Sequence, residues 1–153
     1  MAAARAAADG KNLAEVIKVA EEVRDRVSLI ALLDTVRYIY RTGRIPKIAA
    51  LVGSLLNIKP IFTISSGIPH FMTVVRNRKR GIDQLLKIMR DKVGLNPVHV
   101  AVMHAYAPDE GERLKERISS EFNCTELWFT EFSPVMGYAC GTGTLGAAFY
   151  SEE

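Results

Sequence analysis

Residues 46–64 read PKIAALVGSLLNIKPIFTI and join an expected helix to an expected strand. Pro46 suits the first turn of a helix, because the N–H that it lacks would have no partner there. Apolar residues then surround the helix on almost every side, which predicts that it is buried. Asn57 ends the helix, and Ile58–Ile64 is expected to form a strand. A short loop should connect this strand to a second one at Phe71–Val75.

Hydrophobic periodicity and capping residues predict further helices and strands along the rest of the chain. We expect helices at residues 12–26, 36–42, 82–93 and 108–122, and strands at residues 27–33, 98–104, 127–132 and 145–150. Asn12 and Glu15 predict a capping box, and Asp34 with Thr35 predicts a second helix cap. Together these elements predict an α/β fold with α+β character, in which a mixed β-sheet has helices mainly on one face.

The composition favours one cytoplasmic domain. A chain of 153 residues can bury a substantial core. Its net charge of +3 is too small to predict nucleic-acid binding by itself. Lysine or arginine interrupts each apolar run before it reaches the ~20 residues of a membrane span. Cys124 and Cys140 lack the spacing and the histidine partners of a zinc site, so free thiols in a reducing compartment are expected.

The segment 137–144 (GYACGTGT) is the most distinctive part of the chain. Its glycines let the backbone approach a ligand closely, and successive N–H groups could form a nest for a carboxylate or phosphate. Tyr138, Thr142 and Thr144 could add hydroxyl groups. The alternative is a tight turn before a strand. The segment is not a P-loop, because no lysine followed by serine or threonine comes after the glycines.

A basic cluster, Arg76–Arg80 (RNRKR), is expected where a strand meets a helix. It could contact an acidic partner surface or a phosphate. The alternative is a solvated helix start, although cations at that position oppose the helix dipole. Among the histidines, His104 is a better site candidate than His70, and His99 is expected on the surface. The sequence contains no recognisable catalytic triad, paired catalytic carboxylates or metal-ligand set.

Several stretches of this chain resemble the second domain of the DegV family of bacterial proteins. They are DTVRY (34–38), TGRI (42–45), AALVGSLLNIKPI (49–61), VRNRK (75–79), VAVMHA (100–105), PVMG (134–137) and LGAAFY (145–150). The resemblance covers nearly the whole chain from about Asn12 onward. Residues 1–11 would then be the tail of a connecting helix, and residues 12–153 the carboxy-terminal lipid-binding domain, without the amino-terminal domain.

The resemblance implies a cytoplasmic protein of the EDD fold that holds one long-chain fatty acid between two domains. Family members present the acyl carboxylate to a separate fatty acid kinase and perform no reaction themselves. The chain is therefore expected to be a carrier with no catalytic residues, cofactor or metal. Its partners would be the fatty acid, the kinase and an amino-terminal DegV domain.

The resemblance and the residue patterns together predict which residues bind the ligand and the partner, although plain core packing is the alternative for Leu51, Leu55 and Met136. The expected lipid-binding residues are Leu51, Leu55, Met136, Gly137, Tyr138, Ala139, Cys140, Gly141, Thr142 and Gly143, and the expected partner-binding residues are Arg76, Arg78, Lys79 and Arg80. Ala139 stands where the family usually has a histidine that helps to hold the carboxylate. A hydrogen bond to a charged group contributes about 1.5–3 kcal/mol. Head-group binding is therefore expected to be weaker, or rebuilt from N–H groups with Tyr138 or Thr142.

Two alternative functions remain open from the sequence. The chain could be an interaction or regulatory module that uses the basic cluster Arg76–Arg80. It could instead be an enzyme that binds a phosphorylated substrate at residues 137–144, with His104 or Asp34 as the base. A domain that has lost its neighbour would also expose an apolar face, so self-association is expected.

Overall fold

The computed structural model describes residues 1–43, 58–65 and 68–151. Six strands in this part of the chain form one mixed sheet in the order β3-β2-β1-β6-β4-β5. The strands are β1 (Ser28–Leu32), β2 (Lys59–Ser65), β3 (Ile68–Val75), β4 (Val98–His104), β5 (Cys124–Glu131) and β6 (Leu145–Ser151). Only β4 and β5 are parallel, and the other neighbouring strands are antiparallel. The α/β fold class with a mixed sheet is therefore confirmed.

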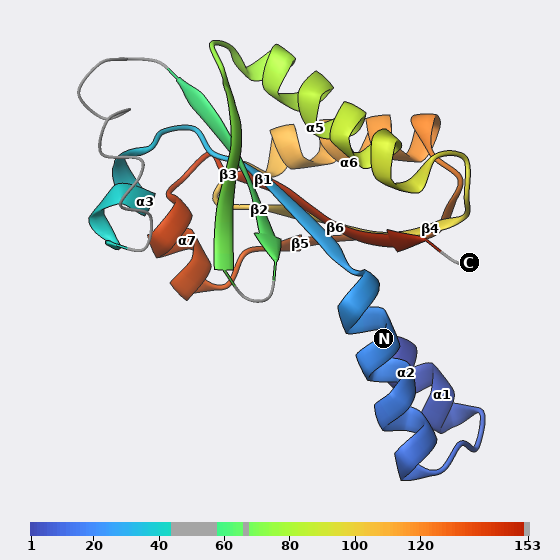
Figure 1. Ribbon diagram of the computed structural model, residues 1–153. Helices are drawn as coiled ribbons and strands as arrows, with labels where there is room; N and C mark the ends of the chain where they lie inside the picture. Colours follow the sequence, from blue (N-terminus) through green and yellow to red (C-terminus); the bar gives the residue numbers. More distant parts are fainter. Residues whose placement is uncertain (44–57, 66–67, 152–153) are drawn as a thin grey trace.

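Two long helices, α5 (Arg78–Val93) and α6 (Pro108–Glu121), cover one face of the sheet (Figure 1). We call this face the helix-covered face. Each helix is amphipathic, and its apolar stripe packs on alternate strand residues to form the main core. Ile30, Leu32, Val100, Val102 and Phe149 are almost completely buried beneath these helices. The expected helices at residues 82–93 and 108–122 are confirmed, and the first begins four residues earlier than expected, at Arg78.

The opposite face, which we call the open face, carries two short helices at one end. They are α3 (Arg37–Arg41) and α7 (Pro134–Cys140), and they pack against each other and over β1 and β2. Ala31 and Phe62 lie beneath them in a second, smaller core. Among the described residues, Figure 1 shows no further helix over the open face. Helices cover the two faces unequally, as the sequence predicts.

The amino-terminal helices α1 (Ala2–Ala8) and α2 (Leu13–Arg26) form a hairpin that projects away from the sheet (Figure 1). The predicted capping box is present, because Asn12 Oδ1 accepts from the Glu15 N–H and Glu15 Oε2 accepts from the Asn12 N–H. No residue of α2 is buried, although its apolar positions recur at helical spacing. Helix α2 therefore gains little stability from burial.

Three expected boundaries are corrected by the structure. The predicted loop between the second pair of strands is shorter, because β3 begins at Ile68. Asp34 does not cap a helix, since α3 starts at Arg37 and the Thr35 hydroxyl accepts from its N–H group. The first four residues of the glycine-rich segment 137–144, expected as a loop, form the end of helix α7. The expected buried helix after Pro46 lies outside the described residues, as do Leu51 and Leu55.

Candidate functional site

The open face contains an apolar cavity of about 190 Å³ where α3 and α7 meet the sheet. Its walls come from alternate residues of the strands and from the inner sides of both helices. The strands contribute Leu29, Ala31, Phe62 and Ile64, and the helices contribute Ile39, Met136, Ala139 and Cys140. The hydroxyl of Thr42, which also lines the cavity, donates to the Ile39 carbonyl oxygen at 2.7 Å. Such a cavity favours an apolar chain over a polar ligand.

Helix α7 brings part of the predicted lipid-binding segment to this cavity. The Ser133 hydroxyl accepts from the Met136 N–H at 3.4 Å, and Pro134 occupies the first turn. Helical spacing then places Met136, Ala139 and Cys140 on the side that faces the cavity. Burial raises the pKa of the Cys140 thiol, so the thiol stays neutral and adds to the apolar lining. The glycine-rich segment therefore contributes side chains to the site in addition to backbone.

The backbone after α7 is held by internal hydrogen bonds. The Gly141 N–H donates to the Gly137 carbonyl oxygen at 2.8 Å, and the Gly143 N–H donates to that of Ala105 at 2.7 Å. The buried Thr144 hydroxyl lies within 3.1 Å of the Cys140 oxygen and 2.9 Å of the Gly141 oxygen. The predicted anion nest is therefore wrong for these two N–H groups, which already have acceptors.

Tyr138 and Thr142 are the exposed hydroxyl residues of this segment. Tyr138 lies on the outer side of α7 with 81% of its surface accessible. Gly137, Tyr138, Gly141, Thr142 and Gly143 do not line the cavity. These five positions are close in sequence to the cavity wall, but the helix turns them away from it or places them beyond its end. Sequence reasoning missed all of the strand residues in the wall, whose alternating pattern was the available signal.

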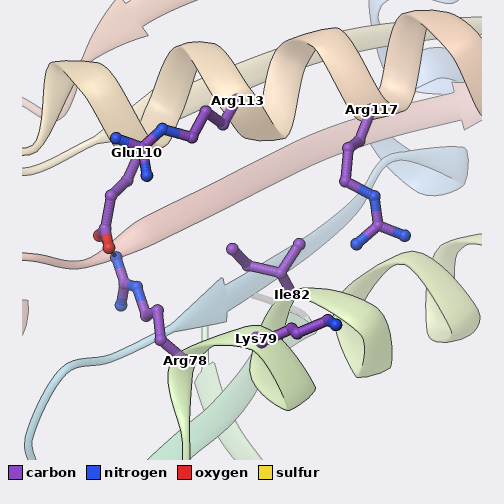
Figure 2. Close-up of a pocket in the computed structure, with 6 residues that line it drawn as sticks. All are labelled: Arg78, Lys79, Ile82, Glu110, Arg113 and Arg117. Carbon is purple, nitrogen blue, oxygen red and sulfur yellow. Dashed lines mark hydrogen bonds and ion pairs between the residues drawn. The ribbon is translucent and has the colours of Figure 1, made fainter.

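The basic cluster Arg76–Arg80 is split between the surface and the interior. Arg76, Lys79 and Arg80 are exposed. Arg78 turns inward with 18% of its side chain accessible, and its Nη2 donates to Glu110 Oε2 at 2.6 Å (Figure 2). The same Nη2 donates to the carbonyl oxygen of Gly143. Arg78 therefore ties the start of α5 to α6 and to the turn before β6.

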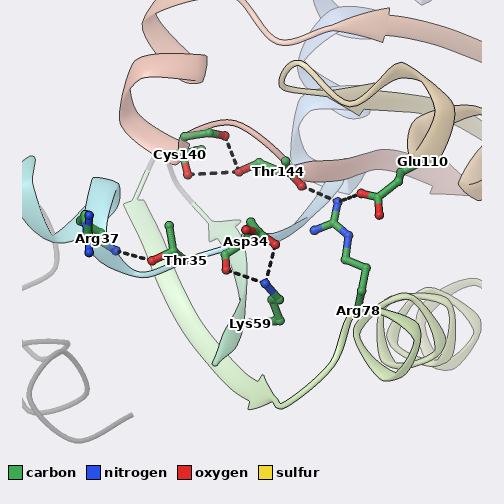
Figure 3. Close-up of polar contacts among 10 residues, drawn as sticks. Asp34, Thr35, Arg37, Lys59, Arg78, Glu110, Cys140 and Thr144 are labelled. Carbon is green, nitrogen blue, oxygen red and sulfur yellow. Dashed lines mark hydrogen bonds and ion pairs between the residues drawn. The ribbon is translucent and has the colours of Figure 1, made fainter. Parts of the chain in front are cut away.

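Asp34 lies in a polar cluster at the end of β1, beside the turn that follows α7 (Figure 3). Its Oδ1 accepts from Lys59 Nζ at 2.5 Å, and its backbone oxygen accepts from the same Nζ at 3.0 Å. A β-carbon built on Gly143 would lie 3.1 Å from the Asp34 β-carbon, which shows how closely the two segments pack. The Asp34–Lys59 pair therefore fastens the segment before α3 to β2. This bond explains Asp34 better than a role as a catalytic base.

The structure places His104 away from the cavity. It is 3% exposed on the helix-covered face, where its Nδ1 accepts from the Ala107 N–H at 3.4 Å. Its ring lies 5.0 Å from that of Phe129. His104 therefore lies on the face of the sheet opposite the apolar cavity.

His99 is buried, not on the surface as predicted. Its Nδ1 lies 2.5 Å from Glu126 Oε2, and its ring stacks on Tyr150 at 4.5 Å. Arg5 of α1 donates to the other carboxylate oxygen of Glu126, also at 2.5 Å. Burial acts to raise the pKa of Glu126, but the hydrogen bonds from His99 and Arg5 outweigh it and lower the pKa. This cluster attaches α1 to the sheet.

In the part of the chain that the structure describes, no group of three or more His, Cys, Asp or Glu side chains is arranged to hold a metal ion. Within the same residues, no helix combines the length and the apolarity that a bilayer crossing requires.

Comparison with known proteins shows which family has this architecture. The sequence model of the DegV family, whose members are described as uncharacterised proteins, matches residues 1–152. The chain belongs to the DegV family. A DegV domain-containing protein of Clostridium acetobutylicum is 34% identical over 154 residues, which include all of this chain and 54% of that protein. The chain spans about half the length of the curated relatives that it matches.

Solved structures of DegV proteins share the fold. A structure from Thermus thermophilus, described as fatty acid binding of a DegV family protein, has a TM-score of 0.87 and 25% identity. The match covers 98% of this chain and 54% of the Thermus thermophilus chain. DegV of Bacillus subtilis, described as a fatty acid binding protein, has a TM-score of 0.80 and 27% identity, with coverage of 99% and 54%. This DegV chain therefore corresponds to about half of each of these proteins.

Proposed function

We propose that this DegV chain forms one wall of a fatty-acid site and carries its ligand without catalysing a reaction. The observation that supports the proposal most directly is the apolar cavity on the open face between α3, α7 and the sheet. An acyl chain gains about 0.8 kcal/mol for each CH₂ group that it buries, so an apolar wall is the main requirement. The fatty-acid-binding descriptions of the DegV proteins from Thermus thermophilus and Bacillus subtilis point to the same ligand.

The cavity is small for a complete long-chain ligand. At about 190 Å³, it lies below the roughly 300–1,000 Å³ of typical ligand pockets. Exposed apolar side chains surround it on the open face, among them Phe71, Met72 and Val135. We propose that a second DegV domain covers this face and encloses the rest of the acyl chain. The coverage of about half of each relative is consistent with such a domain.

The carboxylate is proposed to lie near the outer side of α7. Tyr138 and Thr142 provide exposed hydroxyl groups there, and Ala139 offers no polar atom in its side chain. We further propose that a fatty acid kinase contacts the exposed cations Arg76, Lys79 and Arg80. Their positive charge suits an acidic partner surface. Arg78 is not suited to this contact, because its side chain is largely buried and already bonded.

Filling the cavity tests the proposed function. Ala31 is 7% exposed and lines the cavity, so Ala31→Phe should occupy the space of the acyl chain. Ala101→Phe is the matched control, because Ala101 is a half-buried residue of the open face that does not line the cavity. Each protein is titrated with palmitate by calorimetry, and circular dichroism checks that it is folded.

The expected result is binding of palmitate by the unchanged chain and by the control Ala101→Phe, with at least about tenfold weaker binding by Ala31→Phe. Such a difference corresponds to about 1.4 kcal/mol, or roughly two buried CH₂ groups. Mass spectrometry of organic extracts from the native protein should also detect a fatty acid. Equal affinity for palmitate in folded Ala31→Phe and in the unchanged chain would contradict the assignment of the cavity.

A further inference from the structure

A second hollow lies between α5 and α6, on the side of the sheet opposite the apolar cavity. It has a volume of about 420 Å³, within the usual range for ligand pockets. Figure 2 shows its lining, with Arg78, Lys79 and Ile82 from α5 and Glu110, Arg113 and Arg117 from α6. We call this hollow the basic groove, because four of these six residues are cations and only one is an acid.

Successive ion pairs show that the two helices run in the same direction. Arg78 pairs with Glu110, Asp83 with Arg117, and Arg90 with Glu121, at 2.6, 2.6 and 2.7 Å. The amino-terminal turns of α5 and α6 therefore lie at the same end of the groove. Their helix dipoles add partial positive charge to that end.

The charges in the basic groove are not balanced by the protein. Glu110 forms an ion pair with Arg78, and Arg117 forms ion pairs with Asp83 and Glu121. Lys79 and Arg113 have no carboxylate partner among residues 1–43, 58–65 and 68–151. They belong to opposite walls, so one ligand with two negative charges could pair with both.

Arg78, at the same end of the groove, has hydrogen-bond donors that lack acceptors. One guanidinium nitrogen, Nη2, makes both of its hydrogen bonds, to Glu110 and Gly143. Nε and Nη1 are buried and have no acceptor in the described part of the chain. A buried donor without an acceptor lowers stability by about 1–3 kcal/mol. Protein atoms cover these two nitrogens, so an anion in the groove would meet the positive charge of Arg78 and not these donors.

The sequence at the start of α5 reinforces this imbalance. Three cations, Arg78, Lys79 and Arg80, open the helix, and its first turn contains no acidic residue. Cations at this end oppose the helix dipole, which favours anions there. A bound anion would convert this unfavourable arrangement into a favourable one.

We infer that the basic groove is a binding site for a small anion that carries at least two negative charges, such as a phosphate compound or a polycarboxylate. Lys79 and Arg113 would hold its oxygens by charge-assisted hydrogen bonds, and Arg78 would add the positive charge of a third cation. Ile82 supplies an apolar surface for any carbon skeleton. The inference is independent of fatty-acid binding, because the sheet separates the two hollows.

The test titrates the full chain with pyrophosphate and with citrate, by calorimetry at low salt. We expect one anion to bind per chain, with an affinity that falls as the salt concentration rises. Lys79→Gln and Arg113→Gln should each weaken binding by at least about tenfold, since each removes a charged contact. Tighter binding of pyrophosphate would assign the phosphate class, and tighter binding of citrate would assign the polycarboxylate class.

The control variants remove the same types of charge at a distance from the basic groove. They are Lys92→Gln in the last turn of α5 and Arg24→Gln in α2. Circular dichroism establishes that all four variants are folded. The inference fails if neither anion binds, or if the control variants weaken binding as much as the groove variants do.

Discussion

Gly141 ends α7 with a φ of 84°, in the left-handed region that favours glycine. A β-carbon at this position would also collide with the ring of Tyr38. Gly141→Ala should therefore carry two costs, backbone strain and displacement of Tyr38. The loss in the free energy of unfolding should reach about 2–4 kcal/mol, measured by urea denaturation.

Gly94→Ala separates these two costs. Gly94 has a φ of 57°, but nothing lies within 4 Å of the position of its added β-carbon. This variant should lose only the strain contribution of about 1–2 kcal/mol. Equal losses in the two variants would show that contact with Tyr38 does not restrict residue 141.

Glu126 should make the stability of the chain depend on acid pH. Its pKa is lower in the folded protein than in the unfolded chain, so its stabilising effect is complete above the unfolded value of about 4.3. That effect is lost as the pH falls through the folded pKa. Glu126→Gln should lower the melting temperature at neutral pH, and the difference from the unchanged chain should shrink in acid.

Thermal unfolding followed by circular dichroism, from about pH 7 to about pH 3, measures this dependence. Glu116→Gln is the control, because Glu116 is exposed on α6. A difference between Glu126→Gln and the unchanged chain that stays constant over this range would argue against the role of Glu126.

Individual residues show where sequence reasoning reached its limit. The apolar run before Asp34 predicts a strand, but both of its faces are apolar. Leu29 and Ala31 line the cavity, whereas Ile30 and Leu32 join the main core. Only the positions of the helices, which depend on contacts distant in sequence, distinguish the two sets.

At the scale of elements, α2 depends on its cap more than on burial. None of its residues is buried, whereas α5 buries six. Asn12→Ala removes one side of the capping box, which should destabilise α2 by about 1 kcal/mol. Hydrogen exchange of the amides in Leu13–Arg26 should therefore become faster.

The same measurement contains its own controls. Asn96→Ala removes an exposed asparagine from the turn after α5 and should leave exchange in α2 unchanged. The amides of α5 should keep their protection in both variants. Uniformly faster exchange across α2 and α5 in Asn12→Ala would show that the cap acts on the whole domain.

Helix α7 shows how a strong local signal can be misread. Ser133 followed by Pro134 is a typical helix start, and the structure uses both residues in that way. The glycines at 137, 141 and 143 instead predicted a loop, because glycine weakens helices. Packing against α3 and over the cavity compensates for Gly137. The residues of the site were thus partly predictable, but their orientation was not.

At the scale of the molecule, the open face predicts self-association. Phe71 is 42% exposed and Val135 is 70% exposed, and both belong to elements of this face. Exposed apolar patches commonly mark interaction surfaces. Sedimentation velocity should show an average mass that rises with protein concentration, and Phe71→Asp or Val135→Asp should reduce the rise.

Leu95→Asp distinguishes a specific surface from general hydrophobicity. Leu95 is 91% exposed, in the turn between α5 and β4. If this variant reduces the average mass as much as Val135→Asp does, the association does not depend on the open face. A constant monomer mass at all concentrations would contradict self-association altogether.

The position of β6 has a consequence for synthesis on the ribosome. This strand pairs with β1 on one side and β4 on the other, yet it is made after all the others. Until residues 145–151 emerge, the ladder β3-β2-β1 and the pair β4-β5 have no strand to join them. The edges of β1 and β4 therefore stay unpaired during this time, and chaperones or other nascent chains can bind them. The sheet is completed only after translation has passed Ser151.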